Sequence, residues 1–173
     1  MSQKIAVVGA GFIGRSWAMV FSKAGHHVSL YDIDPAALSE AMNLLEINLA
    51  DLESNGLISS KDDLLGRIQP YKTLEGAVDE AEWVQENALE NVQIKRELFS
   101  RMDELLPETT ILASSTSAIP CSDISNGMKG AGRIIVAHPA NPPYLLPIVE
   151  LSGAPETKDE TIFRAKELLE AAD

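Results

Sequence analysis

The chain has 173 residues, of which 26 are acidic and 14 basic, so its formal net charge is −12. Such a surface repels polyanions, so we expect neither nucleic acid nor an anionic membrane as a partner. The sequence has no apolar run long enough to span a bilayer, and it enters an apolar strand soon after Met1 rather than through a signal peptide. Its single cysteine, Cys121, excludes an intrachain disulfide and a multi-cysteine zinc site, so we expect no metal and a cytoplasmic location.

The first half of the chain alternates strand and helix patterns. Apolar runs at 5–8 and 28–31 predict strands, and a helix is expected between them, from about Phe12 to Ala24. Asp34-Pro35 supplies an N-cap and a proline at the first position of a second, longer helix, which ends at Asn55-Gly56. That helix carries one apolar face, formed by Leu38, Ala41, Met42, Leu45, Leu49 and Leu52.

The second half repeats the alternation. Strands are predicted at 83–84, 111–113, 134–137 and 148–151. An amphipathic helix lies between the first two and would bury Ile94, Leu98, Met102 and Leu105. Thr157-Lys158-Asp159-Glu160 fits a capping box for a final helix, with Ile162, Ala165, Leu168 and Leu169 on its buried face. The pattern predicts the α/β class, one domain over 1–173 with a doubly wound, mostly parallel sheet.

The final helix pattern runs to Asp173 with no strand after it. A crossover helix in a parallel sheet normally delivers the chain to another strand. We therefore expect an N-terminal fragment of a longer protein. The alternative is a C-terminal helix that simply covers the sheet.

A glycine-rich turn joins the first strand to the first helix. Gly9 would permit the tight turn, Gly11 a close approach of pyrophosphate to the backbone, and Gly14 close packing of helix on strand. The phosphates would then meet the free N–H groups at the helix N-terminus, around Phe12 and Ile13. The alternative is an ordinary glycine-rich turn.

Asp32 follows Gly14 by 18 residues, at the end of the second strand. A carboxylate there can accept hydrogen bonds from an adenosine ribose and would repel a 2′-phosphate, which favours NAD over NADP. The alternative role for Asp32 is to cap the next helix, for which Asp34 is better placed.

Two further polar segments follow predicted strands. The segment 114–117 reads Ser-Ser-Thr-Ser, and 138–143 begins with His138. An imidazole at that point can take a proton from a substrate hydroxyl, and Glu150, 12 residues later, could accept from its other ring nitrogen. The alternative is a solvated loop with a surface glutamate. His26 and His27 have no such partners, and we expect both at the surface.

Together, the motifs at 9–14, 114–117 and 138–143, with Asp32 and Glu150, resemble the NAD-binding domain of the 3-hydroxyacyl-CoA dehydrogenase family, a Rossmann fold. Within it, 14–19 and 137–144 are most similar to the λ-crystallin / L-gulonate 3-dehydrogenase branch. The resemblance covers the whole chain, including the 21 residues from Ser117 to His138. It implies NAD as cofactor and reversible oxidation of a 3-hydroxy group to a ketone.

The resemblance also implies roles for single residues. His138 matches the family's catalytic base, Glu150 the carboxylate paired with it, and Ser117 a hydroxyl near the nicotinamide and the substrate oxygen. Three more residues match cofactor contacts: Asn141, Glu90 and Lys95. From spacing alone, Glu90 would be a capping or surface acid and Lys95 a solvated helix residue.

The chain departs from the family in two ways. The family's C-terminal helical domain supplies a catalytic asparagine, most of a homodimer interface and part of the substrate pocket, and it is absent here. Acyl-CoA members also carry basic residues on and after the long helix, whereas 35–60 has acids and no Lys or Arg. Lys61 or Arg67 could still serve.

The acidic helix favours a small hydroxy acid or polyol acid such as L-gulonate as substrate. A 3-hydroxyacyl-CoA dehydrogenase with the same chemistry is the alternative. A non-catalytic, NAD-binding crystallin-like protein is a further one.

Overall fold

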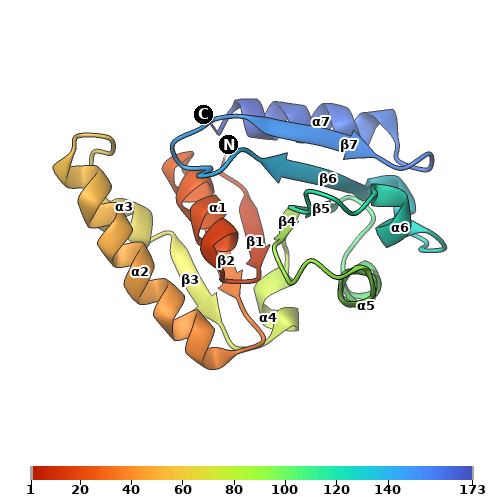
Figure 1. The fold of residues 1–173 in the computed structure, drawn as a ribbon, viewed down its shortest axis with the longest axis horizontal. Coiled ribbons are helices and arrows are strands. Elements are labelled where there is room, and N and C mark those ends of the chain that lie inside the picture. Colours follow the sequence, from red (N-terminus) through yellow and green to blue (C-terminus); the bar gives the residue numbers. More distant parts are fainter. Residues whose placement is uncertain (1, 173) are drawn as a thin grey trace.

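A computed structural model describes residues 2–172, which form one seven-stranded sheet flanked by helices (Figure 1). In chain order the elements are β1 (Lys4–Val8), α1 (Phe12–Lys23), β2 (His27–Tyr31), α2 (Pro35–Ser54), α3 (Lys61–Leu65), β3 (Ile68–Tyr71), α4 (Leu74–Val78), β4 (Trp83–Glu86), α5 (Val92–Leu105), β5 (Ile111–Ser114), α6 (Cys121–Ser125), a 3₁₀ turn (Ala131–Arg133), β6 (Ile134–Pro139), β7 (Val149–Gly153) and α7 (Asp159–Glu170). Within the described residues, no helix combines the length and apolar character that a membrane span requires.

The strand order is β3-β2-β1-β4-β5-β6-β7. The first six strands pair in parallel, and β7 pairs antiparallel to β6. The order reverses direction between β1 and β4, which is where a doubly wound sheet binds ligands at the carboxyl ends of its strands. The predicted doubly wound, mostly parallel architecture is confirmed.

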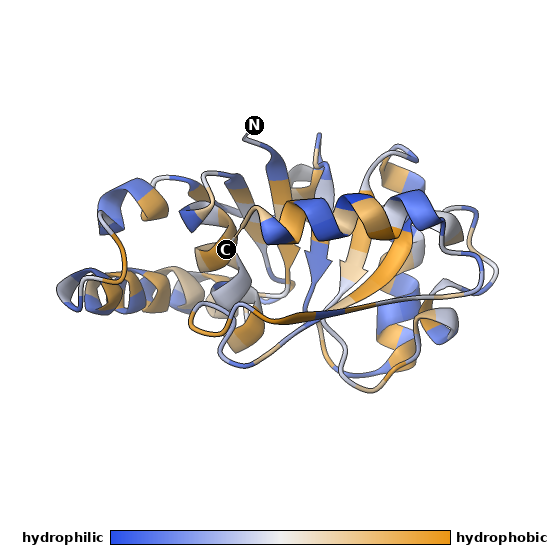
Figure 2. Cartoon of the chain, turned by 90° about the horizontal axis from the view of Figure 1, so that it is seen from above, coloured by the Kyte–Doolittle hydropathy of each residue, from blue (hydrophilic) through white to orange (hydrophobic). Residues whose placement is uncertain are grey.

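Side-chain alternation along the strands divides the core into two layers. Ile5 and Val7 of β1 face a cluster that includes residues of α1, α2, α3 and α7. Ala6 and Val8 face a second cluster with α4, α5 and α6. The longer helices are amphipathic, with orange and blue stretches along their length in Figure 2. Trp17, Trp83 and Cys121 are buried.

The long helix α2 follows its sequence signals closely. Asp34 caps it by accepting a 2.9 Å hydrogen bond from the N–H of Ala36, and Pro35 is its first residue. Of the predicted apolar face, Leu38, Ala41, Leu45, Leu49 and Leu52 are buried and Met42 is half-buried. The helix ends at Ser54, with Asn55 as its C-cap.

Several elements differ from the sequence prediction. Strand β3 and the short helices α3, α4 and α6 were not expected, because each is four or five residues long and too short for a clear period. The capping box at the final helix is wrong. Helix α7 begins at Asp159 with Lys158 as its N-cap and has no side-chain cap, because the Thr157 hydroxyl accepts from the N–H of Ala154 instead, at 2.9 Å.

Helix α5 is rotated relative to the predicted apolar face. Of the four residues expected to be buried, Met102 is buried and Leu98 half-buried, whereas Ile94 and Leu105 are exposed. Phe99, which was not among them, is fully buried. Lys95, expected in solvent, also faces the interior and is 1% exposed. This lysine forms a buried ion pair, which is described with the site below.

His26 is a further correction, because it is buried rather than at the surface. Its Nδ1 accepts a 3.1 Å hydrogen bond from the backbone N–H of Gln3, and its ring lies edge-on to Phe21. Burial disfavours the charged imidazolium and lowers the pKa of His26 below its ordinary value. The neighbouring His27 is exposed, as expected.

We predict that His26 makes stability depend on pH. Because its folded-state pKa is lowered, the unfolded chain binds the extra proton as pH falls through about 6.5, so the free energy of unfolding decreases there. The decrease levels off below the folded-state pKa and cannot exceed about 1.4 kcal/mol per pH unit. Urea unfolding at a series of pH values measures it.

His26→Gln removes the titrating group and should flatten the curve, whereas His27→Gln, at the adjacent exposed position, should keep the wild-type slope. Equal slopes for all three proteins would contradict the assignment.

Candidate active site

The glycine turn lies between β1 and α1, and two of its glycines are required by close packing. Gly9 has φ +94°, and a Cβ there would lie 2.6 Å from the backbone oxygen of Asn87. A Cβ on Gly14 would lie 1.8 Å from the backbone oxygen of Gly9. A Cβ on Gly11 would have no atom within 4 Å, so this position faces open space.

The N-terminus of α1 carries no competing anion. Its N-cap, Gly11, has no side chain that could cap the helix, and the first turn contains no acidic residue. The positive end of the helix dipole and its free N–H groups, near Phe12 and Ile13, are therefore available to a bound anion.

Asp32 ties the end of β2 to this turn. Its Oδ2 accepts a 2.7 Å hydrogen bond from the N–H of Ala10, and its Oδ1 accepts one of 2.9 Å from the N–H of Asp34. The carboxylate is half-buried beside the glycine turn, and capping of α2 is left to Asp34. Asp32 thus follows the second strand, as the sequence predicted, and lies next to the turn.

His138 and Glu150 face each other across two antiparallel strands. The register pairs His138 of β6 with Glu150 of β7, and Nδ1 lies 3.0 Å from Oε2. The two side chains are 34% and 80% exposed. A proton on Nδ1 that is donated to Glu150 leaves the lone pair on Nε2, which has no partner among residues 2–172. The expected contact between His138 and Glu150 is present.

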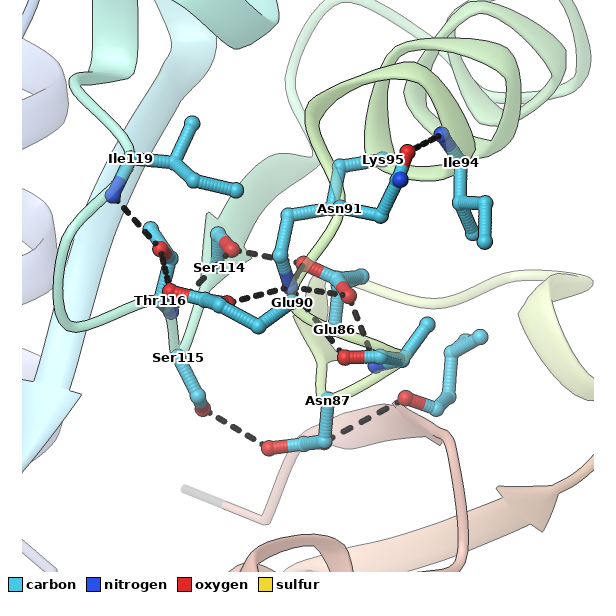
Figure 3. Close-up of polar contacts among 12 residues, drawn as sticks. Glu86, Asn87, Glu90, Asn91, Ile94, Lys95, Ser114, Ser115, Thr116 and Ile119 are labelled. Carbon is cyan, nitrogen blue, oxygen red and sulfur yellow. Dashed lines mark hydrogen bonds and ion pairs between the residues drawn. The ribbon is translucent and has the colours of Figure 1, made fainter.

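The loop after β5 is held by Glu90 (Figure 3). Oε1 of Glu90 accepts hydrogen bonds from the Thr116 hydroxyl and from the N–H groups of Ser117 (3.2 Å) and Ala118 (3.3 Å). Burial works to raise the pKa of the Glu90 carboxyl. The Thr116 hydrogen bond, the charge of Lys95 and the two N–H groups outweigh it, so the pKa lies below its ordinary value. Ser117 itself is exposed.

Beneath this loop lies an ion pair that sequence reasoning missed. Nζ of Lys95 is 2.8 and 3.0 Å from the two oxygens of Glu86, and both side chains are buried. The Ser114 hydroxyl and the N–H of Ala88 also donate to Glu86, at 2.6 and 2.7 Å. The available signal was a charged residue at the end of the short strand β4.

A second polar cluster joins the neighbouring strands. The Ser115 hydroxyl accepts from Trp17 Nε1 (3.0 Å) and Gln85 Nε2 (2.8 Å), and it donates to Asn87 Oδ1 (2.7 Å). Gln85 Nε2 also donates to the carbonyl of Ala137 at 3.2 Å, next to the histidine. These contacts fix the carboxyl ends of β4, β5 and β6 relative to one another and to α1.

The structure therefore groups the predicted residues at one edge of the sheet. Gly9–Gly14 and Asp32 follow β1 and β2, and Glu90 and Ser117 follow β4 and β5. His138 and the exposed Asn141 belong to the end of β6. Within residues 2–172, no three His, Cys, Asp or Glu side chains are arranged to hold a metal ion.

The chain matches a known protein family along almost its entire length. The sequence pattern of "3-hydroxyacyl-CoA dehydrogenase, NAD binding domain" matches residues 4–173. The chain belongs to this family. NAD is accordingly its cofactor, and the glycine turn fits that molecule, because Gly11 leaves open space in front of an uncapped helix N-terminus.

Relatives and solved structures agree with the family. A "Lambda-crystallin homolog" from Bos taurus is 39% identical over 168 residues, covering 95% of this chain and 52% of that protein. An "L-carnitine dehydrogenase" from Streptomyces griseus is 39% identical over 155 residues, covering 90% and 46%. The structure of 3-hydroxybutyryl-CoA dehydrogenase from Escherichia coli superimposes with a TM-score of 0.95 at 29% identity, covering 99% and 37%. The chain spans about half the length of the curated relatives it matches.

We predict that Gly11→Ala separates cofactor binding from folding. Its methyl group meets no protein atom, so the free energy of unfolding should change by about 1 kcal/mol or less, the cost of alanine at an N-cap. The same methyl occupies the space in front of the helix N-terminus, so NADH affinity should fall by at least about tenfold. Thermal unfolding and calorimetric titration with NADH measure the two effects.

Gly14→Ala is the matched comparison. Its methyl collides with the Gly9 carbonyl, so both stability and NADH affinity should fall. Wild-type NADH affinity in Gly11→Ala would argue against this turn as the phosphate site.

Proposed function

We propose that this protein is an NAD-dependent dehydrogenase that oxidises the 3-hydroxy group of a small hydroxy acid or polyol acid, such as L-gulonate, to a ketone. The observation that carries the proposal is the His138–Glu150 pair, at 3.0 Å, on the same sheet edge as the glycine turn. A histidine oriented by a carboxylate is a suitable general base for a substrate hydroxyl.

In the proposed reaction, each site residue has a separate role. Nε2 of His138 accepts the hydroxyl proton, and Glu150 stabilises the imidazolium that results and holds the ring in place. The Ser117 hydroxyl, exposed on its loop, donates to the substrate oxygen. The bound NAD supplies the acceptor for the hydride that leaves the same carbon. Asp32 contacts the adenosine ribose and favours NAD over NADP, while Glu90 and Asn141 complete the cofactor site. Lys95 is buried and acts on that site through its ion pairs with Glu86 and Glu90.

Charge on the α2–α3 surface supports a free acid over a coenzyme A thioester. Lys61, one of two cations that could meet a polyphosphate, lies 3.4 Å from Glu46 and 3.6 Å from Asp62. The hydrogen bond with Glu46 and the charge of Asp62 raise the pKa of Lys61. Arg67 donates to the backbone carbonyl of Asp63. Both cations are engaged locally on an acidic surface, which makes a poor polyphosphate site.

A 3-hydroxyacyl-CoA thioester is the second candidate substrate. The observation in its favour is the similarity to the structure of 3-hydroxybutyryl-CoA dehydrogenase, with a TM-score of 0.95.

The relatives' greater length supports a two-domain protein. The part of each relative that aligns with this chain is about half of that relative's length. An apolar cavity of about 620 Å³ lies between α1, α2 and the 143–149 segment, lined in part by Leu49 and Tyr144. Leu145 and Leu146 at its edge are exposed. We propose that 1–173 is an N-terminal domain, that further chain covers this cavity and completes the substrate pocket, and that the whole protein is a cytoplasmic homodimer.

Steady-state kinetics on the two-domain protein test the substrate assignment. We expect higher kcat/KM with L-gulonate or L-carnitine than with 3-hydroxybutyryl-CoA, and NAD should be preferred to NADP. The 173-residue chain should bind NADH yet turn substrate over poorly. Highest kcat/KM with the thioester would favour the second candidate, and no turnover of any of the three would contradict the proposed activity.

We predict that His138→Ala in the two-domain protein lowers kcat by about 10²–10⁴, the usual effect of losing a general base. NADH affinity should stay near the wild-type value, because the imidazole acts on the substrate. Glu150→Gln should also be slow, with a shifted pH profile, because the imidazolium loses its carboxylate partner. Near-normal turnover by His138→Ala would reject the mechanism.

A further inference from the structure

Glu86 is a charged side chain placed where solvent does not reach. It is 0% exposed at the end of β4, and its carboxylate is surrounded by donors from three elements. The donors are Nζ of Lys95 on α5, the Ser114 hydroxyl on β5 and the N–H of Ala88 after β4 (Figure 3). A buried carboxylate with a full set of donors holds its surroundings in one geometry.

Lys95 extends this geometry toward the surface. Besides Glu86, its Nζ lies 3.5 Å from Oε2 of Glu90 and 3.3 Å from the carbonyl oxygen of Ala88. The other oxygen of Glu90 accepts hydrogen bonds from the Thr116 hydroxyl and from the N–H groups of Ser117 and Ala118. A continuous series of charge-assisted contacts therefore runs from Glu86 through Lys95 and Glu90 to the loop that carries Ser117.

A second buried ion pair in the same chain shows what a purely structural pair looks like. Asp103 and Arg133 are 2.8 Å apart and mostly buried. Arg133 also donates to backbone carbonyls of Pro107 and Thr110, and Asp103 accepts from the N–H of Gly130. None of these groups belongs to the sheet edge that carries the candidate site. The Glu86 pair differs because its third member, Glu90, is 45% exposed at that edge.

We propose that Glu86 is a positioning residue for the nicotinamide side of the cofactor site. It fixes Lys95, which holds the Glu90 carboxylate on the N–H groups of Ser117 and Ala118, so the loop is ordered before the cofactor arrives. A preorganised loop avoids the cost of ordering on binding. The inference rests on the proposed function, which puts the nicotinamide next to Ser117.

Glu86→Gln tests the proposal, since it keeps the shape of the side chain and removes its charge. Binding of NADH and of ADP-ribose, which lacks the nicotinamide, is measured by calorimetry on the 173-residue chain. We expect NADH affinity to fall by about tenfold or more, the loss typical of one charge-assisted contact. ADP-ribose affinity should stay within about twofold. NADH fluorescence in the bound state should move toward its value in water.

Asp103→Asn is the matched control, because it removes the charge of the other buried carboxylate. It should lower Tm and leave the ratio of NADH to ADP-ribose affinity unchanged. If Glu86→Gln does not fold, Ser114→Ala takes its place. It deletes the hydroxyl that donates to Glu86 at 2.6 Å and also accepts a longer hydrogen bond, 3.3 Å, from the N–H of Thr116. It should lower the ratio in the same direction by at least about twofold.

The outcomes distinguish the inference from the proposal beneath it. Suppose that the wild-type chain binds NADH more tightly than ADP-ribose. An unchanged ratio of the two affinities in Glu86→Gln then overturns the role of Glu86 alone, and the same holds for Ser114→Ala if Glu86→Gln does not fold. Equal losses for both ligands, as from general destabilisation, also overturn it. A wild-type chain that binds both ligands equally, with unchanged NADH fluorescence, overturns the nicotinamide placement and the inference together.

Discussion

The contact between Gly14 and the carbonyl of Gly9 is the constraint on which the site depends. A Cβ on Gly14 would lie 1.8 Å from that oxygen, so the start of α1 can approach the end of β1 only without a side chain. This approach directs the uncapped N-terminus of α1 toward the point where the strand order reverses. Asp32 on one side, through its bond to Ala10, and the Asn87 backbone on the other complete the turn.

Parallel pairing then brings the remaining groups to the same edge, because the first six strands end there. The antiparallel strand β7 contributes the carboxylate that pairs with the histidine, since its register puts Glu150 opposite His138. The polar residues between the glycine turn and the histidine are fixed by hydrogen bonds, chiefly those of Glu86 and Ser115. The candidate site thus consists of residues at the ends of several strands. Buried ion pairs and side-chain amides fix these strand ends in place.

Local signals were enough to predict much of this arrangement. The glycine spacing and the Asp34 cap each depend on residues close in sequence. The pairing of His138 with Glu150 was implied by the resemblance to the family, since the residues alone left a solvated loop as the alternative. The predictions that failed concern side chains whose partners lie on another structural element. Lys95 looked solvated because its partner, Glu86, lies on another element, and His26 looked exposed because its partner is the backbone of Gln3. Residue periodicity does not report such contacts, and the roles carried over from the family stay predictions.

Amide and imidazole NMR shifts during titration of the 173-residue chain with NADH test the central claim most directly. The account predicts that the amides of Gly11 to Gly14 and Ser117, together with the ring of His138, shift as one binding event. The amides of Leu49 and Tyr144, which line the apolar cavity, should not shift. Shifts confined to the cavity, with the glycine turn unmoved, would contradict it.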